Sequence, residues 1–202
     1  IRYMLQFIAK ENDRYSVPEQ VQMAIEGGCR WVVLSVPGAD DAEIREGAAG
    51  IIPVCKEEST LLTIENHVEL ARELGIHGVL LTDPEIDFSK TREFCGPEAI
   101  IGVTVYDVAE AIALKNDDVD YLALPYDLDP ATVQNALGEI RAAGVIIPIV
   151  VTGDYPLPVI ESLFSAGISG VALDVTVTSK ADPVAATREI VNTLEKYRTN
   201  PF

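Results

Sequence analysis

The chain has 202 residues, of which 48% are hydrophobic, and its 32 acidic against 15 basic residues give a formal net charge of -17. This length and apolar content predict a single domain over 1–202 that buries a substantial core. So negative a field disfavours nucleic acid and anionic membranes as partners. No apolar run approaches the roughly 20 residues of a membrane span. Three widely spaced cysteines without metal-type pairing are typical of reduced thiols, so we expect a cytoplasmic protein.

A short unit recurs along the chain: a residue that ends a helix, then a short polar stretch, then an apolar run that ends abruptly. The four copies are 28–35, 75–82, 118–125 and 167–174. Glycine begins three of them, and a glycine just past a helix end adopts left-handed backbone at little cost. Uninterrupted apolar strands of this kind are typical of sheets that are covered on both faces.

Strands and helices are predicted to alternate from end to end. The predicted strands are 4–8, 31–34, 61–64, 78–81, 100–105, 121–124, 149–151 and 171–173. The predicted helices are 18–26, 42–57, 68–74, 89–94, 109–115, 130–143, 157–166 and 183–197. Ser16, Asp129 and Asp182 stand just before prolines that begin helices. Eight such units with short loops favour a closed, single-domain (β/α)8 TIM barrel over an open doubly wound sheet.

In such barrels the active site lies where the strands end. The residues at these ends are Lys10, Asn12, Ser35, Glu65, Asn66, Thr82, Asp83, Glu85, Thr104, Tyr106, Asp107, Tyr126, Asp127, Gly153, Asp154, Asp174, Thr176 and Lys180. Taken singly, Asp, Ser and Thr there fit turns and helix caps as well as they fit a site. Taken together, Glu65, Asp83 and Glu85 from adjacent strands could present oxygens to Mg²⁺. Trp31, at the entry to the second strand, is expected to pack against helices.

Seven segments carry a family resemblance in the correct order. They are EGGCRWVVLS at 26–35, TIENHVELA at 63–71, GIHGVLL at 75–81, GPEAIIGVT at 96–104, DY at 120–121, IPIVVTG at 147–153 and AGISGVA at 166–172. Together they resemble thiamine-phosphate synthase and its thiazole tautomerase relatives over nearly the whole chain. The resemblance implies a (β/α)8 barrel of thiamine biosynthesis. It also implies a transferase that joins a pyrimidine pyrophosphate to a thiazole phosphate, with Mg²⁺ assisting departure of pyrophosphate from a carbocation-like centre and no organic cofactor.

The chain departs from this family where the family binds pyrophosphate. Val33, Ser35 and Pro37 stand where a Gln-x-Arg-x-Lys pattern is expected, and Glu65 with Asn66 replaces an Asn-Asp or Asp-Asp pair. Because pyrophosphate needs charge-assisted donors, bare helix N-termini or a metal, these replacements predict weak binding. The cations left to compensate are Lys10, Arg14, Lys90 and Lys180.

Other positions keep only part of the family pattern. Thr104 replaces a serine, the loop after the sixth strand is shortened, and Gly153 with Asp154 replaces a Gly-Gly phosphate turn. Asp154 and Asp174 put carboxylates where a phosphate would approach, and Val175 aligns with a serine. The rim and the resemblance together assign catalytic roles to Glu65, Asn66, Thr104 and Asp174, ligand binding to Ser35, Thr82, Tyr126, Gly153, Asp154 and Lys180, and Mg²⁺ to Glu65, Asp83 and Glu85.

Three functions stay open. The first is a divergent thiamine-phosphate synthase with weak or no activity, and the second is a noncatalytic pseudoenzyme that binds thiamine-related ligands or partners a thiamine enzyme. The third is a barrel enzyme that uses carboxylates such as Glu65 and Asp174 as acid and base. It predicts a carboxylate with a raised pKa in a closed pocket. Each implies a small-molecule ligand at the C-terminal face of the barrel, and a homodimer is a further option.

Overall fold

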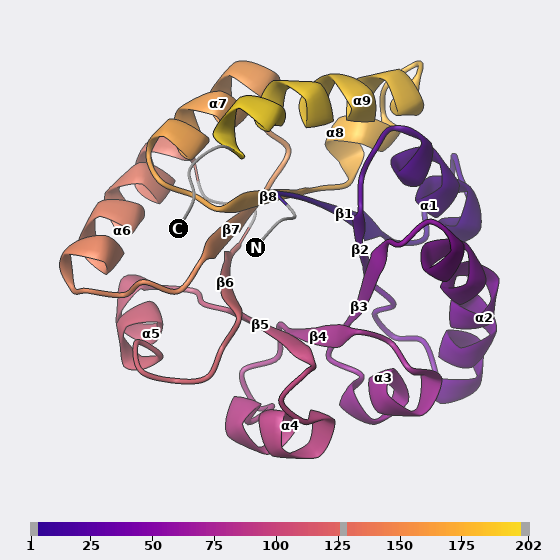
Figure 1. Cartoon of the computed structure of the whole chain (residues 1–202), viewed down its shortest axis with the longest axis horizontal. Helices are drawn as coiled ribbons and strands as arrows, with labels where there is room; N and C mark the ends of the chain where they lie inside the picture. Colours follow the sequence, from indigo (N-terminus) through magenta and orange to yellow (C-terminus); the bar gives the residue numbers. More distant parts are fainter. Residues whose placement is uncertain (1–3, 126–128, 199–202) are drawn as a thin grey trace.

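Eight short, almost wholly buried segments pair side by side as parallel strands in a closed barrel (Figure 1). The computed structural model describes residues 4–125 and 129–198. The strands are β1 (Leu5–Ala9), β2 (Trp31–Leu34), β3 (Leu61–Glu65), β4 (Gly78–Leu81), β5 (Ile100–Thr104), β6 (Tyr121–Leu124), β7 (Ile149–Thr152) and β8 (Gly170–Leu173). Each strand pairs with the next, and β8 pairs with β1, with Phe7 opposite Leu173, to close the ring. The predicted TIM barrel is confirmed.

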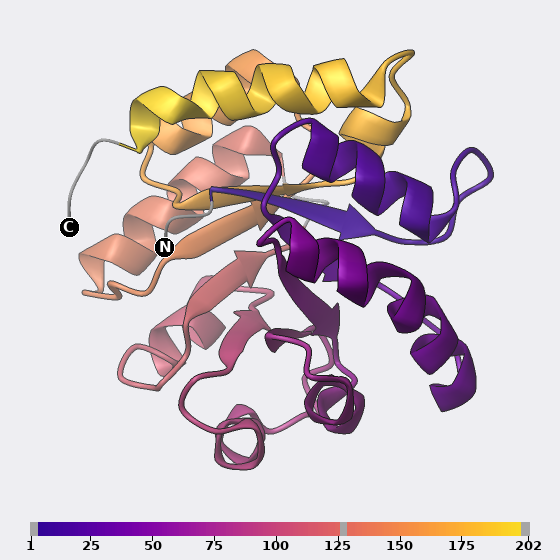
Figure 2. The ribbon, with the colours of Figure 1, turned by 45° about the vertical axis from the view of Figure 1, so that its right-hand side comes forward.

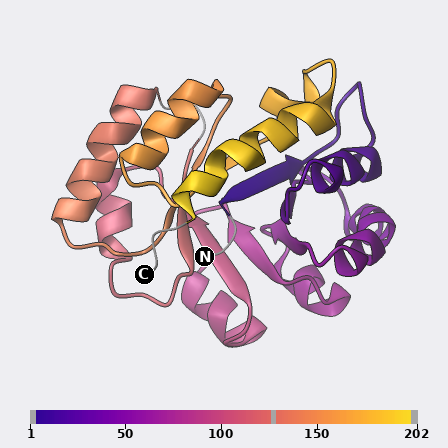
Figure 3. The ribbon, with the colours of Figure 1, turned by 45° about the horizontal axis from the view of Figure 1, so that its top comes forward.

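Helices surround the barrel on its outside (Figures 1 and 3). They are α1 (Val17–Glu26), α2 (Asp41–Glu57), α3 (Val68–Leu74), α4 (Phe88–Cys95), α5 (Val108–Ala113), α6 (Pro130–Ala142), α7 (Leu157–Ser165), α8 (Val175–Thr178) and α9 (Pro183–Leu194), with a 3-10 turn at Glu195–Tyr197. The four-residue helix α8 was not predicted. In the described ranges 4–125 and 129–198, no helix is both long enough and apolar enough to cross a membrane.

The signals that start and end helices act as predicted. Ser16 accepts a hydrogen bond from the Glu19 N–H at 3.3 Å, and the Glu19 carboxylate accepts one from the Ser16 N–H at 2.7 Å. Asp129 and Asp182 likewise accept hydrogen bonds from N–H groups in the first turns of α6 and α9. These caps satisfy backbone donors that have no partner inside the helix. The helix-ending Gly75 has a φ of 68°, in the left-handed region that glycine adopts easily.

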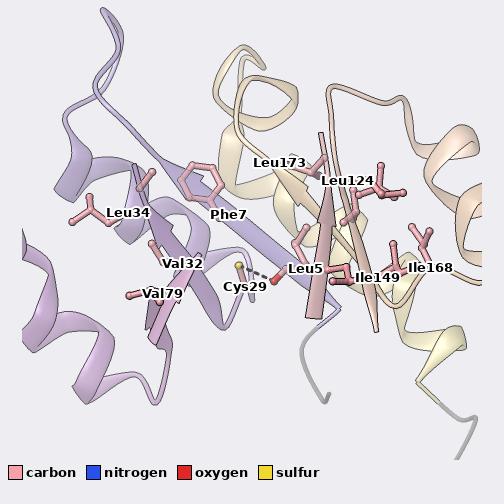
Figure 4. Packing of buried hydrophobic residues seen from close by; sticks show 14 of the residues in the cluster. Leu5, Phe7, Cys29, Val32, Leu34, Val79, Leu124, Ile149, Ile168 and Leu173 are labelled. Atoms are coloured by element: carbon pink, nitrogen blue, oxygen red, sulfur yellow. Dashed lines mark hydrogen bonds between the residues drawn. The ribbon is translucent and has the colours of Figure 1, made fainter. Parts of the chain in front are cut away.

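The larger core lies between the strands and the helices (Figure 4). Its strand-borne members include Phe7, Val32, Leu34 and Val79, all at most 3% exposed. Cys29 belongs to it, with its Sγ 3.6 Å from the Leu5 carbonyl oxygen. Burial raises the pKa of the Cys29 thiol to about 11, which keeps it protonated and unreactive at neutral pH.

A second, smaller core fills the barrel interior, and it contains Trp31. The Trp31 ring meets Tyr121 edge to face at 5.2 Å, and its Nε1 donates to Thr63 Oγ1 at 3.2 Å. The expectation that Trp31 packs against helices is therefore wrong, because the alternation of β2 turns this residue inward. Gly102 makes room for the pair, since a Cβ at that position would lie 2.2 Å from the Tyr121 ring.

Candidate active site

Four polar residues lie at the C-terminal ends of strands, on the side that faces the barrel interior. Side chains two positions apart on a strand share a face. The residues two positions earlier, Ile8, Val33, Thr63 and Ala172, face the barrel interior. The polar residues that follow them therefore lie over the open C-terminal mouth: Lys10, Ser35, Glu65 and Asp174. They come from the ends of β1, β2, β3 and β8, which are consecutive around the ring.

These four side chains form two pairs. Lys10 Nζ lies 2.6 Å from Asp174 Oδ2, and the Ser35 hydroxyl donates to Glu65 Oε2 at 2.8 Å. The Asp174 side chain is 16% exposed and that of Lys10 is 44% exposed, so the ion pair borders on solvent. The sequence predicted roles for Ser35, Glu65 and Asp174, and the fold brings these three together with Lys10.

Glu65 is a carboxylate of the mouth whose pKa the fold perturbs. Burial raises the pKa of the Glu65 carboxyl, and the negative charge of Asp174 adds to this rise. The hydrogen bond from Ser35 and the ammonium of Lys10 act in the opposite direction, because both favour the ionised form. The direction agrees with the raised pKa expected of an acid–base carboxylate, and the group lies at the mouth where substrates reach such barrels.

Asn66 has a structural task beside this group. Its φ is 66°, and its Oδ1 accepts hydrogen bonds from the backbone N–H of Thr82 at 2.7 Å and of Asp83 at 3.1 Å. Its Nδ2 donates to Thr82 Oγ1 at 2.7 Å. Both ends of the amide are thus engaged in fixing the β4 exit against β3, while the Tyr106 hydroxyl donates to the Thr82 carbonyl at 2.7 Å.

The predicted magnesium ligands are not gathered into one set. Among residues 4–125 and 129–198, no three His, Cys, Asp or Glu side chains are grouped so that they could hold a metal ion. Asp83 Oδ1 accepts the Glu85 N–H at 2.9 Å, which closes a local turn, and Glu65 faces Ser35. Glu65, Asp83 and Glu85 therefore do not form one preassembled set of ligands in this structure.

The remaining residues with a predicted catalytic or ligand-binding role are spread around the rim. Asp154 accepts a hydrogen bond from the Thr176 hydroxyl, which ties the β7 exit to α8. Gly153 lies under Tyr155, whose ring would be 2.3 Å from a Cβ at that position, so packing alone requires a glycine there. Thr104 is partly buried at the end of β5, and Lys180 is exposed beyond α8. Tyr126 lies outside the described residues.

A cavity of about 240 Å³ adjoins the mouth at the seam between β1 and β8. Polar and charged residues line it, mostly through the apolar parts of their side chains: Lys10, Asn12, Asp13, Arg14, Gln20, Asp174, Thr178 and Ser179. A second cavity, of about 80 Å³, lies at the opposite end of β1 beside Met4 and α9. The larger one borders the strand ends, where barrels carry out their chemistry.

Sequence reasoning named Lys10 and Arg14 only as spare cations and overlooked Gln20. Lys10 follows the first strand, and its partner Asp174 follows the last, so no local pattern joins them. Gln20 is a polar residue 1% exposed within α1, which marks a structural contact, but nothing in the sequence identifies its partner.

The fold and the site place the chain in the class of (β/α)8-barrel proteins, with carboxylates and a lysine at the C-terminal mouth. The model of the thiamine monophosphate synthase family matches residues 5–177. The chain therefore belongs to the thiamine monophosphate synthase family.

Individual relatives agree with this assignment. The chain is 31% identical over 200 residues to a thiamine-phosphate synthase of Bacteroides thetaiotaomicron, with 93% of this chain and 96% of the relative covered. It is 28% identical over 193 residues to one of Pyrococcus abyssi, covering 91% and 92%. The fold matches a solved thiamine phosphate pyrophosphorylase from Pyrococcus furiosus with a TM-score of 0.84, 22% identity and 97% coverage of both chains.

Proposed function

We propose that this chain is a divergent thiamine-phosphate synthase that joins a pyrimidine diphosphate to a thiazole phosphate at the barrel mouth, with weak turnover. The observation that supports it best is the placing of Glu65 and Asp174 over the barrel interior, with Ser35 and Lys10 as their partners. Weak turnover is expected because Val33, Ser35 and Pro37 replace residues that bind pyrophosphate in the family. We expect the reaction to take place in the cytoplasm.

The electrostatics of the mouth suit this reaction. When diphosphate leaves with the bonding electron pair, positive charge develops on the pyrimidine-bearing carbon, and the thiazole nitrogen then donates its pair to form the new C–N bond. Fixed carboxylates near that carbon stabilise the developing charge in a partly dehydrated site. Glu65 and Asp174 would supply this charge, and the Ser35 hydroxyl would hold the Glu65 carboxylate in one orientation.

The test is formation of thiamine phosphate from the two substrates, with excess Mg²⁺ and high protein concentration, read as thiochrome fluorescence. Glu65→Gln keeps the size of the side chain and removes its charge, so we expect a loss of about tenfold or more. Glu85→Gln removes an exposed carboxylate from the same end of the barrel and serves as the matched variant. Equal losses in the two variants would favour the magnesium assignment, and unchanged turnover in Glu65→Gln would contradict the role of Glu65.

A second function is favoured by the raised pKa of the Glu65 carboxyl. A carboxyl group with a raised pKa is a better base when it is ionised and can take and return a proton, as a tautomerase requires. The discriminating measurement follows deuterium incorporation into a thiazole phosphate in D2O by NMR. Exchange that depends on Glu65, without formation of thiamine phosphate, would favour this alternative.

The third function is noncatalytic. A folded protein that shows neither reaction but binds a thiamine-related cation would be a pseudoenzyme, acting alone, as a homodimer or with a thiamine enzyme. The carboxylates of Glu65 and Asp174 support such a ligand because they pair with cations. Calorimetric titration with thiamine, compared between the native chain and Glu65→Gln, tests this function.

A further inference from the structure

Among the residues that the structure describes, the loop after β2 has no basic side chains to bind the negative charge of a phosphorylated substrate. The family's cations at the end of β2 are replaced, and Glu65, Asp83 and Glu85 do not form a metal site among the described residues. In a chain with a net charge of -17, binding of a phosphate depends on local donors that offset this field.

Two basic residues line one cavity beside the mouth. Lys10 and Arg14 both line the cavity of about 240 Å³ at the β1–β8 seam, together with Thr178 and Ser179. The cavity is smaller than the roughly 300–1,000 Å³ of pockets that enclose a whole ligand. Its size and its two basic residues therefore suit one charged end of a ligand whose remainder lies in the mouth.

The connection that carries these cations is held in place by a buried amide. Gln20 is 1% exposed, and its Nε2 donates to the carbonyl oxygens of Lys10 at 2.6 Å and of Tyr15 at 2.9 Å. Asn12 Oδ1 accepts the N–H groups of Arg14 and Tyr15, both at 2.9 Å. Figure 2 shows this connection, in indigo, projecting beyond the end of β1. A loop fixed in this way loses little entropy when it binds a ligand.

Two carboxylates, those of Asp13 and Asp174, line the cavity beside the two basic residues. Lys10 Nζ contacts Asp174 Oδ2 at 2.6 Å and keeps its positive charge in this pair, and an ammonium has three donor hydrogens. Asp13 is exposed, where solvent and salt screen its charge. Arg14 contributes a planar fork of N–H donors that matches phosphate oxygens.

We propose that this cavity is a phosphate site, in which Lys10 and Arg14 bind the phosphate end of a substrate in place of the family's cations at the end of β2. The inference rests on the proposed function for the identity of that substrate. The recognised chemistry is a tetrahedral phosphate group, supplied either by the pyrimidine diphosphate or by the thiazole phosphate.

The experiment is calorimetric titration of the full chain with inorganic diphosphate and, separately, inorganic phosphate at low ionic strength. We expect Arg14→Gln and Lys10→Gln each to weaken binding by about fivefold or more, as loss of a charge-assisted hydrogen bond predicts. Arg14 is exposed and its side chain is remote from the core, so Arg14→Gln tests the site even where Lys10→Gln impairs folding. Tighter binding of diphosphate assigns the site to the pyrimidine substrate, and equal binding assigns it to the thiazole phosphate.

The control is Lys56→Gln, which removes the same charge from an exposed position in the last turn of α2. It should bind both anions within about twofold of the native chain, since separated surface charges are screened. Absence of binding, an unaffected Arg14→Gln, or an equal loss in Lys56→Gln would each overturn the phosphate site.

The measurements distinguish an error in the proposed phosphate site from an error in the proposed synthase activity. Thiamine phosphate formation with unaffected anion binding in Arg14→Gln would leave the proposed function standing and remove the site. Anion binding that depends on Arg14, in a protein that forms no product, would do the reverse.

Discussion

Lys10 and Asp174 join the first strand of the barrel to the last, with 2.6 Å between Lys10 Nζ and Asp174 Oδ2. The pair lies where the first and last strands of the chain, β1 and β8, pair to close the barrel. Both residues also line the cavity of about 240 Å³, and both charges act on the pKa of the Glu65 carboxyl. The electrostatic balance of the mouth therefore depends on closure of the barrel.

The pKa of Glu65 should report this balance. Asp174→Asn removes a negative charge that raises the Glu65 pKa, so the pKa should fall, whereas Ser35→Ala removes a hydrogen bond that lowers it, so the pKa should rise. NMR titration of carboxyl carbons measures both shifts. Asp154→Asn is the control, since Asp154 is not among the charges that shift Glu65. Shifts of the same sign in the two test variants would contradict the assignment.

Stability should depend on pH through the same group. The folded pKa of Glu65 is raised above the ordinary value of about 4.3, so its contribution to stability is complete below that value and is lost as pH rises through the folded pKa. The free energy of unfolding of Glu65→Gln, relative to the native chain, should therefore increase with pH across this window. Urea denaturation at several pH values measures it.

Glu73→Gln is the comparison of opposite sign. The hydrogen bond from Arg45 lowers the pKa of Glu73, so its contribution is present above the ordinary value and is lost as pH falls through the folded pKa. The relative stability of this variant should decrease as pH rises. Slopes of the same sign for the two variants would contradict the role described for one of the two carboxylates.

Gly102→Ala should destabilise the barrel interior. The added methyl would lie 2.2 Å from the Tyr121 ring, and overpacking of this kind costs about 1–3 kcal/mol. Gly138→Ala provides the contrast, because that residue is exposed in α6 with no atom within 4 Å of the new methyl. We expect that variant to gain about 0.5–1 kcal/mol from helix propensity. A Gly102→Ala protein as stable as the native chain would contradict the packing of Trp31 against Tyr121.

Asn66→Ala should cost stability at the strand exits. It leaves the N–H groups of Thr82 and Asp83 without their acceptor, which typically costs about 1–3 kcal/mol. Asn66→Gly removes the same side chain but tolerates the φ of 66°, so the difference between the two variants isolates backbone strain. Thermal unfolding measures both, and Asn66→Asp, which keeps an acceptor oxygen, should lose least.

The order of elements and the fold class could be predicted from local pattern. The predicted strands agree with the observed ones to within one residue at either end, because each apolar run is bounded by a cap, a glycine or a polar stop. Helix α8 was missed because four residues carry no measurable periodicity. Trp31 was misplaced because every residue of β2 is buried, so its pattern does not reveal which face is inward.

The sequence by itself determined that polar residues would gather at one end of a barrel, since parallel strands all end on the same side. Only the tertiary structure decided which of them meet. Ser35 reaches Glu65 across adjacent strands, Asn66 turns to the backbone of Thr82, and Lys10 finds Asp174 where the ring closes. These partnerships depend on strand register and side-chain direction, which arise from packing of the whole barrel and leave no mark in a local stretch of sequence.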